Sequence, residues 1–147
     1  MFMGMFQHNI DVKGRLNLPT QFREAINATP DGTLVLTRHL DRCLVLYPSL
    51  EWNNFKEKAK QLPSMDPEVR RFLRFLYSRA MPCTLDKQGR ILVPPPLRDY
   101  AELNGETCLI GMDHKIEIWN VERWSEEDNL TTANPNEIQK AMAQLGM

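Results

Sequence analysis

The chain has 147 residues, of which 42% are hydrophobic and 25% charged, a composition typical of a soluble globular protein with one substantial core. The net charge of −1 conceals a segregation, because residues 1–100 carry 15 Lys/Arg against 10 Asp/Glu and residues 101–147 carry 3 against 9. No apolar run reaches the roughly 20 residues of a membrane helix, and the apolar start lacks the basic region of a signal peptide. We therefore expect a cytoplasmic protein without membrane association, whose basic body offers a surface to a polyanion.

The cysteines do not form a recognisable disulfide or metal framework. Their number is odd, no Cys-x-x-Cys pair occurs, and Cys43 and Cys108 lie inside apolar runs, where a small buried thiol is typical. The three histidines share no spacing with a carboxylate or thiol that would make a metal site or a catalytic pair. We therefore expect no metal and no cofactor.

Residues 5–18 are predicted to form a β-hairpin. Apolar residues alternate before and after a short polar link, as in two paired strands. Asp11 can accept hydrogen bonds from the amides of the link, and Gly14 can adopt the positive φ that a Cβ would penalise. Pro19 ends the second strand because it has no amide proton to donate.

The remainder of the first half alternates helices and strands. Thr20 is expected to cap a helix over residues 21–27. Two apolar, partly β-branched runs at residues 33–37 and 43–47 are predicted to pair as strands. A helix is expected to follow over residues 48–61, with its apolar side chains in a stripe.

The next helix has a strong start, with Asp66 as N-cap and Pro67 at the first helical position. It is expected to reach Tyr77. The helix is apolar over most of its circumference, and only three arginines interrupt its apolar surface. Contact with one core requires a narrower apolar stripe than this. We therefore expect one side in the core and another in an oligomer interface, whose predicted residues are Arg70, Phe72, Arg74 and Phe75.

The second half of the chain repeats the first. Residues 86–94 (DKQGRILVP) match residues 11–19 (DVKGRLNLP) at a shift of 75, and residues 113–119 match residues 41–47 at a shift of 72. A duplication in two copies indicates one pseudo-twofold domain rather than a solenoid. We predict a small mixed barrel, mainly β with short helices. Its parts are a first half at residues 1–62, a connecting helix at 63–80, a second half at 81–128, and a tail at 129–147 that is disordered or a short helix.

The paired Asp-x-x-Gly-Arg motifs, the start Met-Phe-Met-Gly and the segments Leu-Tyr-Pro (46–48) and Ile-x-Ile-Trp (116–119) together resemble the MraZ family of bacterial transcriptional regulators. The resemblance covers residues 1–128. It implies an α+β, mainly β fold, a double AbrB-like swapped-hairpin barrel whose halves exchange strands. It also implies a nucleoid-associated repressor, a homo-oligomeric ring that binds double-stranded DNA at direct repeats in a promoter upstream of cell-division and cell-wall genes.

The same resemblance places DNA binding on two turns, one in each repeat. Gln88 stands in the second motif where the first has Lys13, so the DNA-reading role goes mainly to the first copy. Arg23 and Arg98 recur by position, which favours a structural role shared by both halves. The expected DNA-binding residues are Lys13, Arg15, Lys87 and Arg90, and the expected turn-forming residues are Asp11, Gly14, Asp86 and Gly89.

Other interpretations of these residues stay open. Each motif arginine could pair with the aspartate of its own turn and only brace it. Two symmetry-related aspartates also resemble an aspartic-protease dyad, but those enzymes place Ser/Thr and Gly after the Asp. Because Val12-Lys13 and Lys87-Gln88 follow here, we do not expect an enzyme. The remaining rival is an oligomeric scaffold or antitoxin-like interaction module, which would use the surface of residues 72–77 or the tail.

Overall fold

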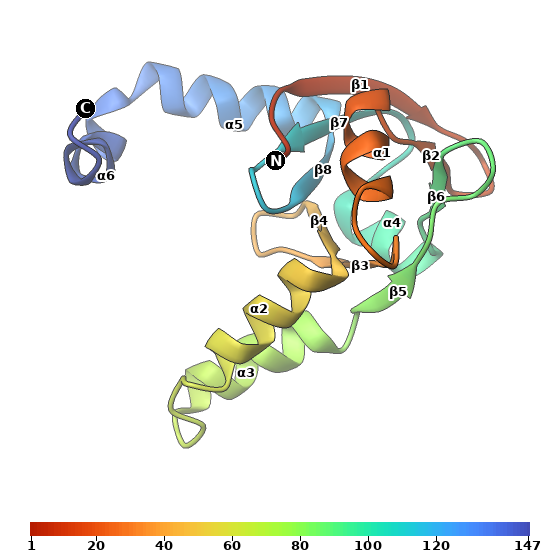
Figure 1. The fold of residues 1–147 in the computed structure, drawn as a ribbon. Helices are drawn as coiled ribbons and strands as arrows, with labels where there is room; N and C mark the ends of the chain where they lie inside the picture. Colours follow the sequence, from red (N-terminus) through yellow and green to blue (C-terminus); the bar gives the residue numbers. More distant parts are fainter.

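The structure, a computed structural model, describes residues 1–147 and gives the two repeats the same order of elements. Each repeat runs strand, strand, helix, strand, strand, helix, and α3 connects the two (Figure 1). The first contains β1 (Met5–Ile10), β2 (Arg15–Asn17), α1 (Thr20–Asn27), β3 (Leu34–Arg38), β4 (Leu44–Pro48) and α2 (Ser49–Ala59), followed by α3 (Pro67–Tyr77). The second contains β5 (Met81–Cys83), β6 (Arg90–Leu92), α4 (Pro95–Ala101), β7 (Gly105–Gly111), β8 (Ile116–Asn120) and α5 (Val121–Ala133), followed by the 3-10 helix η1 (Pro135–Ile138) and α6 (Gln139–Gln144).

The eight strands form one antiparallel sheet in the order β5-β3-β4-β8-β7-β1-β2-β6. Strands of the two repeats interleave, because β1 pairs with β7, β2 with β6, β3 with β5 and β4 with β8. The two outermost strands, β5 and β6, are consecutive in the chain and are joined by the turn in which the amide of Asp86 donates to the carbonyl of Arg90 at 2.8 Å. The sheet is therefore a nearly closed barrel, and the predicted strand-swapped double barrel is confirmed.

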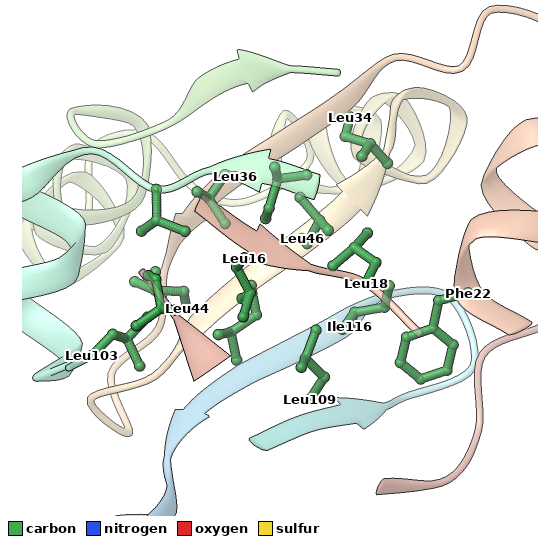
Figure 2. Packing of buried hydrophobic residues seen from close by; sticks show 14 of the residues in the cluster. Leu16, Leu18, Phe22, Leu34, Leu36, Leu44, Leu46, Leu103, Leu109 and Ile116 are labelled. Carbon is green, nitrogen blue, oxygen red and sulfur yellow. The ribbon is translucent and has the colours of Figure 1, made fainter. Parts of the chain in front are cut away.

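The two repeats share one hydrophobic core. Its main cluster contains 18 buried residues drawn from both repeats and includes Phe2, Leu16, Phe22, Ile91 and Leu109. Figure 2 shows leucines of β2, β3 and β4 meeting Leu109 and Ile116 of the second repeat in the barrel interior. Each fully buried side chain of this kind contributes about 1.5–3 kcal/mol. Neither repeat closes a core alone, so the duplication makes one folding unit.

An arm made of α2 and α3 projects from the barrel (Figure 1). The carboxylate of Asp66 accepts a hydrogen bond from the amide of Glu68 at 2.9 Å, so the predicted N-cap of α3 is confirmed. The C-terminal end of α3 is fixed to β3. Thr37 Oγ1 donates to the carbonyl of Leu76 at 2.6 Å, and Arg38 Nε donates to the carbonyl of Phe75 at 2.9 Å. The arm is thus attached to the barrel through β3.

One detail differs from the sequence-based expectations. Thr20 does not cap α1, because Pro19 is the N-cap and Thr20 is already the first helical residue, with no side-chain cap bond at this end. Helix α5 begins after Asn120, whose side chain accepts hydrogen bonds from the amides of Glu122 and Arg123, and it continues to Ala133. None of the helices is both long enough and apolar enough to span a membrane.

The three thiols are unpaired and at least partly buried. Cys43 and Cys108 have no exposed surface, as their apolar surroundings in the sequence predict. Burial raises the pKa of Cys43, and it raises the pKa of Cys83 to about 12. These two side chains therefore stay protonated at neutral pH and act as small apolar core residues.

Candidate nucleic-acid interface

The first repeated motif forms a tight turn organised by one carboxylate. Oδ1 of Asp11 accepts hydrogen bonds from the backbone amides of Lys13 at 3.0 Å and Arg15 at 2.9 Å. The carbonyl of Asp11 accepts the amide of Gly14 at 2.9 Å, and Gly14 has a φ of +87°, which a residue with a Cβ would adopt only under strain. The turn places Arg15 at the first position of β2.

The second motif repeats this geometry. Oδ1 of Asp86 accepts the amides of Gln88 and Arg90, both at 2.9 Å, and the carbonyl of Asp86 accepts the amide of Gly89 at 3.0 Å. The φ of Gly89 is +77°. Arg90 thus begins β6 as Arg15 begins β2, and the two turns are structural copies.

Each motif arginine forms an ion pair with the aspartate of its own turn. Arg15 Nε lies 2.6 Å from Asp11 Oδ2, and Arg90 Nε lies 2.8 Å from Asp86 Oδ2. Hydrogen bonds from the backbone amides of the arginines, followed by their side chains, hold the pKa of both carboxyls below the usual 3.8. Because each pair uses Nε, both terminal nitrogens of each guanidinium stay available for another acceptor.

Pairing of β2 with β6 brings the two turns onto one surface. Arg15 lies opposite Leu92, and Asn17 lies opposite Arg90. These four side chains share the outer face of the two strands, since Leu16 and Ile91 between them are buried. The surface, which we call the turn face, consists of Val12, Lys13, Arg15, Asn17, Lys87, Gln88, Arg90 and Leu92.

Four residues of the turn face were not among the expected DNA-binding residues. Asn17 and Leu92 are exposed at equivalent outward positions, and Gln88 is exposed in the second turn. Val12 is 93% exposed beside Lys13. The alternation of Leu16, Asn17 and Leu18 already predicts an outward Asn17, whereas nothing in the sequence shows that Asn17 and Arg90 are cross-strand neighbours.

The four residues expected at an oligomer interface lie on the arm, and three of them have side-chain contacts within the chain. Phe72 packs against the cluster that contains Tyr47 and Trp52. The guanidinium of Arg38 lies 4.0 Å from the ring centre of Phe75. Arg70 Nη1 donates to the carbonyls of Ser64 and Met65, at 3.1 and 2.8 Å, and closes the loop between α2 and α3, whereas Arg74 is exposed.

Two interleaved repeats in one barrel, each with a basic Asp-x-x-x-Arg turn, define a double AbrB-like barrel protein. The MraZ family model, described as "MraZ protein, putative antitoxin-like", matches residues 1–75 and again residues 76–145. The two matches meet inside α3, the element that connects the repeats. The chain belongs to the MraZ family.

Curated relatives match along most or all of the chain, and each is named "Transcriptional regulator MraZ". One from Pediococcus pentosaceus is 44% identical over 147 residues, the whole of both chains. One from Halothermothrix orenii is 42% identical, again over the whole of both chains. One from Desulforamulus reducens is 48% identical over 124 residues, which is 84% of each chain.

Proposed function

We propose that this protein is a sequence-specific DNA-binding transcriptional regulator, a repressor that works in the cytoplasm on the nucleoid. The observation that carries the proposal is the turn face, where both copies of the basic motif stand on the outer side of one strand pair. The names of the relatives support the regulatory role. The proposed target is a promoter with direct repeats upstream of cell-division and cell-wall genes.

The shape of the turn face fits the major groove of DNA. That groove is about 12 Å wide and admits a two-stranded β-ribbon, and β2 with β6 is such a ribbon with a basic turn at each end. In ordinary sheet geometry Arg15 and Arg90, which are diagonal neighbours, have side chains about 7–8 Å apart. That separation is about two steps of the 3.4 Å base-pair rise, so the two arginines can read bases about two steps apart.

The side chains of the turn face suit base recognition. A guanidinium whose Nε is tied to Asp11 or Asp86 presents its terminal nitrogens as a fixed pair, and such a pair matches O6 and N7 of guanine. Asn17 and Gln88 carry amides, which match N6 and N7 of adenine. The aspartates do not contact DNA in this proposal. They orient the arginines, and their charge is offset by the ion pairs.

Lysines supply contacts to the DNA backbone. Lys13 and Lys87 are exposed in the two turns, where an ammonium group can approach phosphate as a point charge. Figure 1 shows β2 and β6 on one side of the barrel, whereas α5 and α6 extend from the opposite side. Helix α5 carries Glu122, Glu126, Glu127 and Asp128, and these acidic side chains therefore lie away from the turn face.

A homo-oligomer, in the form of a ring, would present several turn faces to successive DNA repeats. One ribbon of two turns binds weakly, but later contacts within a ring become intramolecular and raise the overall affinity without new contacts. The proposed subunit contact is the apolar groove between α2 and α3, which Ala59, Leu73 and Tyr77 line next to Lys56 and Lys60. Arg70 and Arg74 lie on α3, while Phe72 and Phe75 face the barrel.

A band-shift titration on the DNA upstream of its own gene tests the function. The control is the same DNA with its repeats scrambled, and both are titrated at two salt concentrations. The proposal predicts tight binding that needs the repeats and weakens steeply with salt. Equal, weak binding to both DNAs would leave only a non-specific basic surface.

The alternative function is an oligomeric scaffold or antitoxin-like interaction module. It is favoured by the exposed apolar groove of the arm and by the wording of the family description. In that case a protein partner would occupy the arm, and substitutions on the turn face would leave its binding unchanged.

A further inference from the structure

We propose that Arg98 and Arg23 are positioning residues for the two DNA-reading turns, and that each fixes the turn of the opposite repeat. Arg98 on α4, in the second repeat, holds the turn of the first. Arg23 on α1, in the first repeat, holds the turn of the second. The inference rests on the proposed function of the turns in DNA recognition, and it adds two residues that do not belong to the turn face.

Arg98 contacts the first turn through one hydrogen bond to a backbone carbonyl and by packing against Gly14. Its Nε donates to the carbonyl of Val93 at 2.9 Å, and its Nη1 donates to the carbonyl of Val12, inside the turn, at 3.4 Å. The amide of Val93 in turn donates to the carbonyl of Gly14 at 2.7 Å. A Cβ on Gly14 would lie 2.8 Å from Arg98 Nε, so the guanidinium lies directly against the glycine.

Arg23 lies against the second turn in the equivalent place. A Cβ on Gly89 would overlap Cδ and Nη1 of Arg23, which shows the same close approach to the glycine. The amide of Leu18 donates to the carbonyl of Gly89 at 3.1 Å, as Val93 does to Gly14. The contacts therefore cross between the repeats in both directions.

The contacts of Arg98 and Arg23 with the two turns differ in their chemistry. The Arg23 side chain donates a hydrogen bond to Thr20 Oγ1, at 2.9 Å within its own helix, and its buried Nε has no partner. A polar hollow of about 340 Å³ lies between α1 and the second turn, lined by Arg23, Glu24 and Lys87 among others. Arg98 thus holds the first turn by one hydrogen bond to Val12 together with packing against Gly14, whereas Arg23 supports the second turn by packing alone.

Hydrogen exchange in the protein without DNA tests the crossed arrangement. The reporters are the amides of Lys13 and Arg15 in the first turn and of Gln88 and Arg90 in the second, all bound to an aspartate Oδ1. Arg98→Ala should accelerate exchange about tenfold in the first turn and leave the second near its wild-type rate, as expected for local opening after loss of backbone hydrogen bonds. Arg23→Ala should accelerate exchange in the second turn only.

Conservative variants and a binding cycle distinguish positioning from general stability. Arg98→Lys keeps the charge but not the planar two-nitrogen grip, so it should accelerate first-turn exchange with little change in the unfolding midpoint. The losses of binding free energy on upstream DNA should be non-additive for Arg98→Ala combined with Arg15→Ala. The losses for Arg98→Ala combined with Arg90→Ala should be additive. If the alanine variants fail to fold, the lysine variants carry the same comparison.

The result that overturns the inference is exchange that accelerates equally in both turns, in neither, or in the turn of the same repeat. The exchange arm needs no DNA. If the wild-type protein binds no upstream DNA, the proposed function fails on its own. The exchange experiment still decides whether each arginine fixes the turn of the opposite repeat, because it only compares the exchange rates of the two turns in each variant.

Discussion

Leu16 and Ile91 occupy equivalent positions of the two repeats and lie opposite each other in the β2–β6 pair. Both are buried, at 0% and 1% exposure. The local twofold axis of the barrel therefore passes between them, and it relates Arg15 to Arg90 across one strand pair. An arrangement in which the two repeats formed separate barrels would place these arginines on different surfaces. The duplication thus makes one composite face rather than two independent sites.

The close packing of the first turn predicts a large cost for a side chain at Gly14. Gly14→Ala must adopt a φ of +87°, and its Cβ would overlap the Val93 carbonyl and approach Arg98. We expect destabilisation of about 1–2 kcal/mol from the backbone, with about 1–3 kcal/mol more from overpacking. Gly32→Ala is the matched control, since Gly32 has a φ of +63° with nothing within 4 Å. Denaturant unfolding measures both, and equal losses would show that Gly14 is not packed as described.

The turn aspartates predict a loss of turn order in acid. Their folded-state pKa values lie below the ordinary 3.8, chiefly because backbone amides donate to the ionised carboxylates. A lowered carboxyl pKa contributes stability that is fully present above the unfolded pKa and disappears as the pH falls through the folded value. Carboxyl-carbon NMR should therefore give midpoints below 3.8 for Asp11 and Asp86. Turn amides should exchange faster below those midpoints, and Asp11→Asn should abolish this pH dependence in the first turn only. A midpoint at or above 3.8 contradicts the described turn.

The exposed Val12 predicts a preference for thymine. Its side chain is 93% exposed beside Lys13 on the turn face, and the C5-methyl group of thymine is the apolar feature of the major groove. Replacing thymine by deoxyuridine throughout the bound repeats should weaken wild-type binding about fourfold, as expected for loss of one buried methyl group of about 0.8 kcal/mol. Val12→Ala should be insensitive to this replacement. A variant as sensitive as the wild type would place Val12 outside the groove.

The apolar groove of the arm predicts an oligomer that one charge can disrupt. Leu73 and Tyr77 line the groove, and Tyr77 is 39% exposed. Leu73→Glu should lower the mass measured by light scattering towards that of the monomer of 17.1 kDa, because a carboxylate in an apolar contact is strongly disfavoured. Leu40→Glu, at a leucine that is 64% exposed on the barrel, should leave the mass unchanged. An unaltered mass for Leu73→Glu would assign the subunit contact elsewhere.

Several parts of the fold could be predicted from local chemistry. The Asp-x-x-Gly-Arg motif predicts each turn, because one carboxylate and one glycine determine the backbone conformation of the turn. Asp66-Pro67 predicts the start of α3. Thr20 shows the limit of local chemistry. It was expected to be the N-cap of α1, but Pro19 has the extended backbone of an N-cap and the helix begins one residue earlier, at Thr20. The pairing of β2 with β6 is long-range and leaves no local signal, so the swapped strands followed only from the resemblance to the family.

The candidate site shows the same division between local and long-range information. The repeat itself singles out the two turns that carry Lys13, Arg15, Lys87 and Arg90, but the DNA-binding role proposed for these residues came from the resemblance to the family. Asn17, as a neighbour of Arg90, and the contact of Arg98 with the opposite turn depend on which strand lies next to which. The recurrence of Arg23 and Arg98 predicts a structural role shared by both repeats, but it carries no sign that their contacts cross between the repeats.

The measurement that tests the central claim most directly compares Arg15→Ala with Lys13→Ala on upstream DNA, with native and scrambled repeats at several salt concentrations. Arg15→Ala should cost about 1–3 kcal/mol per engaged site and relax the preference for the native repeats, because a base contact is lost. Lys13→Ala should weaken binding to both DNAs equally and reduce the salt slope by about one, because a phosphate contact is lost. A folded Arg15→Ala protein that kept both its affinity and its preference would contradict the turn face as the DNA-reading surface.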